Sequence, residues 1–145
     1  MILPGRICRN SCMHPVGGGS VQKVQESLVA ALAIDGAIGV ALGDWKSGMC
    51  LGFKGTNAPA FPERNLELAV AGMTEVIRSK FRVLESVGVK EDLEEILIVL
   101  KAQYHLVRVV RSVRGLFFYL VMDREKGNLA LARIKLDQIA EQLSI

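Results

Sequence analysis

The stretch 116–136, LFFYLVMDREKGNLALARIKL, decides the fold of this chain. Its first part, 116–122, is an unbroken run of strand-favouring apolar residues, and both of its alternating faces are apolar. A strand that is apolar on both faces lies in the centre of a sheet that is covered above and below. Residues 123–127 break the run with charges and a glycine, and from Asn128, a suitable N-cap, apolar residues recur at helical spacing. The stretch therefore predicts a central strand, a tight turn and a C-terminal helix that folds back over one sheet face.

Two short strands are predicted over 37–42 and 49–54, around the turn-forming residues 43–48. The first strand alternates large and small side chains; its large residues are Ile38, Val40 and Leu42, and its small residues are Ala37, Gly39 and Ala41. A face of glycine and alanine allows a helix to approach closely, so we interpret these glycines as packing residues. Neither GxxxxGK[ST] nor GxGxxG is present, which excludes a nucleotide-hydrolysing P-loop.

Two helices flank these strands in the sequence. Ser20 is the expected N-cap of the first, which ends at Asp35-Gly36. The second follows Pro62 and spans about 22 residues to Leu84. Its core stripe is Leu66, Ala69, Val70, Met73, Val76, Ile77, Phe81 and Leu84. The opposite side carries Leu68, Ala71, Glu75, Ser79 and Arg82, with Gly72 beside them. Such small residues around an outward leucine favour contact with another helix, although a single exposed leucine is also common on protein surfaces.

Three strands are predicted after the long helix. They are 95–101 (EILIVLK), 104–111 (YHLVRVVR) and the central run at 116–122, with a two-residue turn at Ala102-Gln103. Strands joined by tight turns pair antiparallel, and apolar residues on both faces require helices on both. The sequence thus predicts an α/β (α+β) sandwich in three layers, with a five-stranded antiparallel sheet between the long helix and the two terminal helices.

Length and composition limit the class of protein. The 145 residues suffice for one domain, which we assign to 20–145, with 1–19 as an N-terminal tail. The net charge of +3 is too small to indicate nucleic-acid binding, and no run reaches the length of a membrane span. Three cysteines do not form a disulfide framework, so we expect a reducing cytoplasm. Cys8, Cys12 and His14 could ligate a metal, but a structural zinc site needs four ligands; we expect no metal and no cofactor.

No catalytic group is predicted. His105 lies on a strand, where a lone histidine is more often hydrogen-bonded or at the surface than a general base. Asp44 and Asp123 occupy turns, where aspartate is common for structural reasons. Cys50 is interpreted as a small buried hydrophobe. We therefore expect a protein that is not an enzyme.

The order and spacing of these segments resemble the roadblock / dynein light-chain family over 20–145. The matching pieces are IDGAIGVAL followed by DWKSG, EILIVLKAQYHLVRVV, and GLFFYLVMDREKGNLALARIKL, and the last is most similar to bacterial and archaeal members of the MglB type. The resemblance implies a roadblock (profilin-like) sandwich that dimerises by setting the middle strand and the long helix of two subunits side by side. It also implies a platform for Ras-like small GTPases or a subunit of dynein and signalling scaffolds.

If the strand at 95–101 lies at the sheet edge, as the family order implies, it is a template for pairing with another chain. This fits the implied homodimer, or heterodimer with a related roadblock chain. The expected dimer interface is Leu68, Ala71, Gly72, Glu75 and Ser79 of the long helix, with Glu95, Leu97, Val99 and Lys101 of the edge strand. The candidate partner contacts are Arg64, Arg78, Arg82, Arg124 and Arg133. For the last two and for Lys135, ordinary solvated charges are the alternative interpretation.

Three functions compete on these grounds. The first is a regulator of a Ras-like GTPase; Arg64, Arg78 and Arg82 are available as an arginine finger, but the spacing singles out none of them. The second is a structural adaptor with no effect on nucleotide turnover. The third, a small-molecule sensor, is disfavoured because both sheet faces are aliphatic and offer few polar groups to orient a ligand.

Overall fold

The computed structural model describes residues 18–144. Its elements, in chain order, are α2 (Gly18–Leu32), β1 (Ala37–Asp44), β2 (Cys50–Gly55), α3 (Asn65–Ser86), β3 (Glu95–Val99), β4 (Gln103–Val109), β5 (Leu116–Asp123) and α4 (Leu129–Gln142). The expected tail, with Cys8, Cys12 and His14, lies outside the described residues apart from its last two positions, 18 and 19, which belong to α2. Because α2 begins at Gly18, Ser20 lies inside the helix and is not its N-cap.

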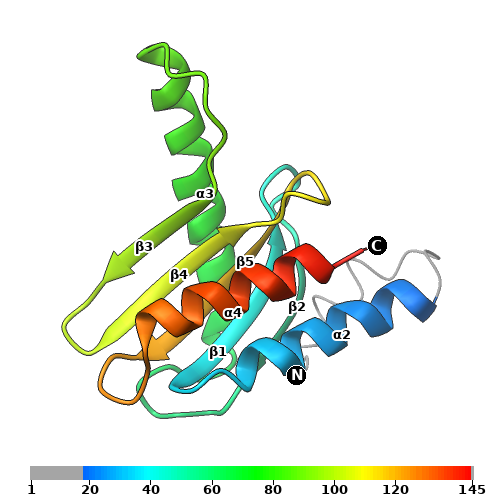
Figure 1. The fold of residues 1–145 in the computed structure, drawn as a ribbon, viewed down its shortest axis with the longest axis vertical. Helices are drawn as coiled ribbons and strands as arrows, with labels where there is room; N and C mark the ends of the chain where they lie inside the picture. Colours follow the sequence, from blue (N-terminus) through cyan, green and yellow to red (C-terminus); the bar gives the residue numbers. More distant parts are fainter. Residues whose placement is uncertain (1–17, 145) are drawn as a thin grey trace.

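The five strands form one antiparallel sheet in the order β2-β1-β5-β4-β3 (Figure 1). The predicted central strand is confirmed: β5 has β1 on one side and β4 on the other, and all of its residues except Asp123 are buried. The strand after the long helix, β3, occupies one edge, and β2 occupies the other.

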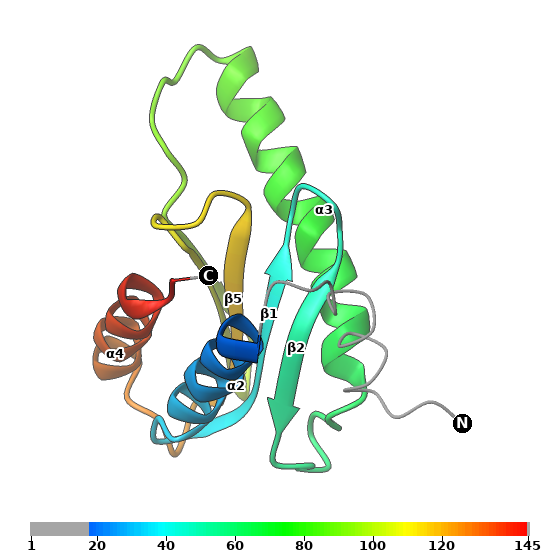
Figure 2. The same ribbon diagram turned by 90° about the vertical axis from the view of Figure 1, so that its right-hand side faces the viewer.

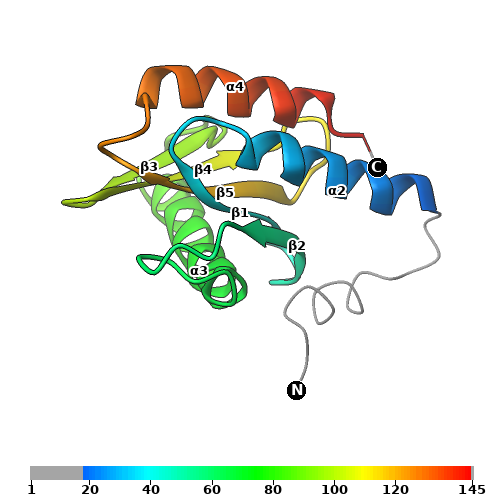
Figure 3. The same ribbon diagram turned by 90° about the horizontal axis from the view of Figure 1, so that it is seen from below.

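The sheet lies between two helical layers, as the sequence predicts (Figure 3). On one face α2 and α4 lie side by side and enclose a core around Leu28, Leu120 and Leu136. On the other face α3 encloses a second core around Phe117 and Tyr119. The alternation of β5 supplies both cores, because its even-numbered residues face α2 and α4 and its odd-numbered residues face α3.

The small residues of β1 allow α3 to pack closely. A Cβ atom on Gly39 would lie 3.0 Å from a methyl group of Leu66, and one on Gly43 would lie 2.7 Å from a methyl group of Val70. One part of the predicted alternation is wrong: Ile38 packs in the α3 core, whereas Ala37 packs with the opposite core. The register between β1 and β5 shifts between Ala37 and Gly39. The side chains of the first two residues of β1 therefore point to the sheet faces opposite to those predicted.

One predicted helix boundary is confirmed by a hydrogen bond, and another lies earlier in the chain than predicted. The Asn128 side chain accepts a bond from the Leu131 amide at 3.0 Å and caps α4. The helix α2 ends at Leu32, before the predicted end at Asp35-Gly36. Gly36 lies in the turn that follows, with a φ of +85°, and a Cβ atom there would lie 2.5 Å from Cα of Gly127. The two turns at this end of the sheet thus pack backbone against backbone, which only glycine permits.

The long helix α3 has the predicted length but extends beyond the sheet (Figure 1 and Figure 2). Residues Leu66, Val70, Thr74 and Ile77 are buried, whereas Phe81 and Leu84 in its last turns are only half-buried. The C-terminal part of α3 and the segment 87–94, which leads back to β3, therefore project from the body of the domain. The expectation that Val76 belongs to the core stripe is wrong, because its side chain is exposed where the helix leaves the sheet.

Candidate protein-binding interface

The edge strand β3 has one neighbour, β4, within residues 18–144. The register pairs Leu97 with Leu106, and the adjoining bonds run from the Val109 amide to Glu94 O and from the Leu100 amide to Gln103 O. In an antiparallel ladder alternate residues bond to the neighbouring strand. The backbone N–H and C=O groups of Glu95, Leu97 and Val99 therefore point away from the sheet and are available to another strand.

The strand is shorter than predicted. It ends at Val99, because the Leu100 amide bonds to Gln103 O and closes a turn. Lys101, expected at the end of the interface strand, lies in this turn. Neither lysine nor proline occurs within β3, and these are the residues that commonly protect sheet edges from pairing.

The side chains of β3 leave apolar surface on both faces. Leu97 and Val99 face the α4 side and are 37% and 54% exposed. Ile96 and Ile98 face the α3 side and are only partly buried. Packing in the core of the domain therefore does not account for the apolar character of this strand.

Next to this edge, the outer side of α3 carries the residues expected at a dimer interface. Leu68 is 75% exposed, and Ala71, Gly72, Glu75 and Ser79 are exposed with it. A Cβ atom on Gly72 would meet nothing within 4 Å, so no contact inside the described chain requires a glycine there. The small residues leave room for a second surface to approach the helix.

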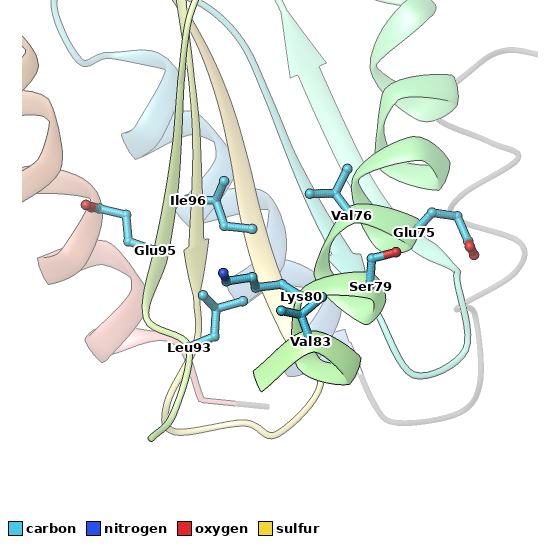
Figure 4. A pocket seen from close by; sticks show the side chains of 8 residues that line it. All are labelled: Glu75, Val76, Ser79, Lys80, Val83, Leu93, Glu95 and Ile96. Carbon is cyan, nitrogen blue, oxygen red and sulfur yellow. The ribbon is translucent and has the colours of Figure 1, made fainter. Parts of the chain in front are cut away.

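A groove of about 580 Å³ separates the C-terminal half of α3 from β3 (Figure 4). Val76, Lys80 and Val83 face it from the helix, and Leu93 and Ile96 face it from the strand side. The carboxylates of two further lining residues point elsewhere: that of Glu75 away from the strand, and that of Glu95 towards α4.

Sequence reasoning missed the groove-facing role of Val76, Lys80 and Val83. A signal was available, because these three residues share one side of the helix at i, i+4 and i+7. It was obscured because Val76 also fits the core stripe.

Four of the five arginines expected to contact partners are engaged within the chain, and two of these lie on α3. The Nε of Arg78 donates to Trp45 O at 2.7 Å and its Nη2 to Lys46 O at 2.8 Å, which braces the β1–β2 turn against α3. Arg82 donates to Ser79 Oγ at 3.0 Å.

The other two engaged arginines lie near β3, and the fifth is accessible. Arg124 donates to Leu100 O at 2.9 Å and lies over the Tyr104 ring. Arg133 donates to Glu95, and this hydrogen bond raises the pKa of the guanidinium group. Arg64, the residue before α3, is exposed.

A small polar cluster lies under the loop that precedes α3. Gln103 Nε2 donates to Ala60 O, so its Oε1 accepts from His105 Nε2 at 2.7 Å, and His105 Nδ1 then accepts from the Tyr119 hydroxyl at 2.9 Å. Burial lowers the pKa of His105 and raises the pKa of Tyr119 to about 12, so both are neutral at pH 7. No nucleophile adjoins them among these contacts, and the cluster serves to fix the loop.

Residues 18–144 contain neither a candidate metal-binding cluster nor a candidate membrane-spanning helix. Within residues 18–144 no three side chains of His, Cys, Asp or Glu lie close enough together to hold a metal ion. No helix in the same range has the length and apolarity to span a membrane.

Comparison with known proteins gives matches among solved structures. The gliding protein MglB from Thermus thermophilus is 19% identical, with a TM-score of 0.72 over 88% of this chain and 90% of that one. An MglB with a tetrameric arrangement is also 19% identical, with a TM-score of 0.73 over the same shares. A Roadblock/LC7 domain from Streptomyces avermitilis is 11% identical, with a TM-score of 0.66 over 80% of this chain and 90% of that one. No family model and no curated protein matches the sequence.

These matches, together with the element order and the layers, show that the chain has the roadblock fold. Within that fold its architecture is of the MglB-like form. The resemblance inferred from the three sequence segments is thereby confirmed for the fold.

Proposed function

We propose that this protein is a non-catalytic, homodimeric binding platform that regulates a Ras-like small GTPase. The observation that carries the proposal is the unpaired outer edge of β3 beside the exposed outer side of α3. We therefore expect the activity of this chain to be binding through this surface.

Two copies can pair through β3 in a simple way. An antiparallel pairing centred on Leu97 sets Glu95 of each copy opposite Val99 of the other and satisfies the outward backbone groups of both strands. It also brings the two α3 helices towards each other, because α3 and β3 line the two sides of one groove. Isologous pairing of this kind is the commonest route to a closed dimer.

The structural neighbours support self-association. One is an MglB with a tetrameric arrangement, and the neighbours also include MglC from Myxococcus xanthus, whose TM-score is 0.57 at 14% identity. We extend from those proteins only the expectation that this chain, too, assembles through its own fold type, with itself or with a related roadblock chain.

The GTPase would bind across the paired α3 helices. Leu68 supplies an apolar contact there, and Arg64 and Arg82 supply exposed positive charge. Arg78 is less suited to act as an arginine finger, because two of its donors already hold the β1–β2 turn. No finger is required if the platform acts by positioning the GTPase's own groups.

The test is to mix the full chain with Ras-like GTPases of the same organism, loaded with GDP or with a non-hydrolysable GTP analogue, and to measure complex formation by calorimetry. We expect one nucleotide state to bind, and we expect Leu68→Glu to abolish binding. Ile134→Glu is the matched control, because Ile134 is an exposed apolar residue on the opposite face. Absence of binding in both nucleotide states would contradict the proposal.

The alternative function is a structural adaptor that uses the same interface without changing nucleotide turnover. Single-turnover GTP hydrolysis by the bound partner distinguishes the two. A rate that is unchanged by saturating amounts of this protein would favour the adaptor.

A further inference from the structure

We propose that Arg108 is a positioning residue for the self-association edge: it clamps β3 to α4 and so presents the outer side of the strand in a fixed pose. This inference rests on the proposed function for its consequence, but the clamp itself is a property of the single chain.

Arg108 is the only charged residue that is buried among residues 21–144, with 9% of its surface exposed. It lies on β4 opposite Glu95 of β3. Its Nη2 atom is 2.6 Å from Asp137 Oδ1 on α4, and its Nη1 atom is 3.7 Å from Glu95 Oε1. One buried cation thus joins the edge strand and the helix above it.

Glu95 is held from a second side. Arg133 of α4 reaches it with Nη2 at 2.6 Å and Nε at 2.8 Å, both to Oε2. The Glu95 side chain is 13% exposed, although the residue is the first of an edge strand. A carboxylate that was expected to lie in the interface is instead turned inward between two arginines, and only its backbone faces outward.

The clamp matters because β3 has few other contacts: the partly buried Ile96 packs on the α3 core, and the exposed Glu94 beside the strand pairs with Arg111. The strand is held by one ladder of five residue pairs to β4, and the groove separates it from α3. On the α4 side its apolar residues Leu97 and Val99 remain exposed, so the ionic contacts of Glu95 replace the apolar packing that fixes β5. Without the clamp the strand would sample many conformations. Ordering it on dimerisation would then cost conformational entropy and weaken any dimer that pairs through this edge.

The experiment compares Arg108→Met with wild type and with Lys135→Met. Methionine keeps a flexible apolar stem in place of the arginine and removes the guanidinium group. Lys135→Met removes the same charge from an exposed position of α4 that makes no ion pair within residues 18–144. Two readouts are used: amide hydrogen exchange in the monomeric state, and the dimer dissociation constant from analytical ultracentrifugation.

We expect Arg108→Met to accelerate exchange of the Ile96 and Ile98 amides, which bond to β4 by the register, at least about tenfold relative to the Leu120 amide in β5. The dissociation constant should rise by a similar factor, and Lys135→Met should change neither readout. Equal acceleration in β3 and β5 would mean a general loss of stability and would overturn the positioning role, as would exchange at wild-type rates.

A substitute variant covers the case in which Arg108→Met does not fold, and the exchange readout covers the case in which the wild type is monomeric. If Arg108→Met does not fold, Asp137→Asn, which weakens the clamp from the half-exposed α4 side, is judged by the same two readouts. If the wild type does not self-associate, the proposed function fails, and the exchange measurement still decides the clamp by itself.

Discussion

The strands β5 and β3 have nearly the same kind of sequence and opposite environments. LFFYLVM is apolar along both faces, and so is EILIV after its first residue, Glu95; yet β5 is buried between two neighbours while β3 is half-exposed with one. A strand that is apolar on both faces is therefore expected to be buried on both faces. The sequence does not say whether the same chain or a second chain covers it. In β5 the burial is supplied by the chain itself, and in β3 we infer that a second chain supplies it.

The largest expected effect is the difference in stability loss between a leucine-to-alanine substitution in β5 and one in β3. Leu120→Ala in β5 should destabilise the monomer by about 2–5 kcal/mol, because Leu120 is fully buried and its loss leaves a cavity. Leu97→Ala in β3 should cost less than about 1 kcal/mol, because that side chain is partly in water already. Urea unfolding at low protein concentration measures both, and equal losses would contradict the distinction between the strands.

The next effect concerns Gly43 of β1, which lies where α3 packs on the central strands β1 and β5. A Cβ atom on Gly43 would lie 2.7 Å from the Phe117 ring as well as from Val70, so Gly43→Ala should destabilise the fold by about 1–3 kcal/mol through overpacking. Thermal unfolding followed by circular dichroism is the measurement. A neutral substitution would show that α3 is packed less tightly on the central strands than the structure indicates.

His105 lies between the two strands and makes the fold sensitive to acid. Its folded-state pKa is lowered by burial, so the unfolded chain takes up a proton first as the pH falls below about 6.5. Stability is thus fully present above that pH and declines below it, with a slope of at most ~1.4 kcal/mol per pH unit from this one group.

The pH measurement needs a control without the titrating ring. Urea unfolding of wild type and of His105→Asn between pH 8 and 5.5 should show the slope in the wild type only. Parallel curves would show that another group causes the pH dependence.

The smallest effect has the opposite sign. Gly72 lies inside α3 with open space around it, so Gly72→Ala should stabilise the monomer by about 0.5–1 kcal/mol through helix propensity. The added methyl group should weaken the dimer if two copies approach at this position. A variant that gains stability and dimerises as well as wild type would place the contact elsewhere on α3.

The sequence predicts the fold well because local signals coincide with it. The two-sided apolar run of β5, the Asn128 cap and the 22-residue span of α3 each follow from spacing or residue type alone. The resemblance placed β3 at the sheet edge, and the topology confirms that position.

What the sequence does not predict depends on contacts between distant segments. Glu95 and Arg133 are 38 positions apart, and no periodicity reveals that they pair. The exposure of Val76 has a similar origin, because it reflects the point at which α3 leaves the sheet. The interface residues themselves remain predictions, because pairing between two chains depends on contacts that neither chain makes alone.

The most direct test of the central claim is sedimentation of the wild type beside two proline variants of β3. The Leu97 amide points outward and the Ile96 amide bonds to β4, so Leu97→Pro should abolish pairing with little loss of fold stability, whereas Ile96→Pro should unfold the edge. We predict a dimeric wild type at micromolar concentration and a folded, monomeric Leu97→Pro chain. A wild type that stays monomeric at hundreds of micromolar, or a Leu97→Pro chain that still dimerises, would contradict the account.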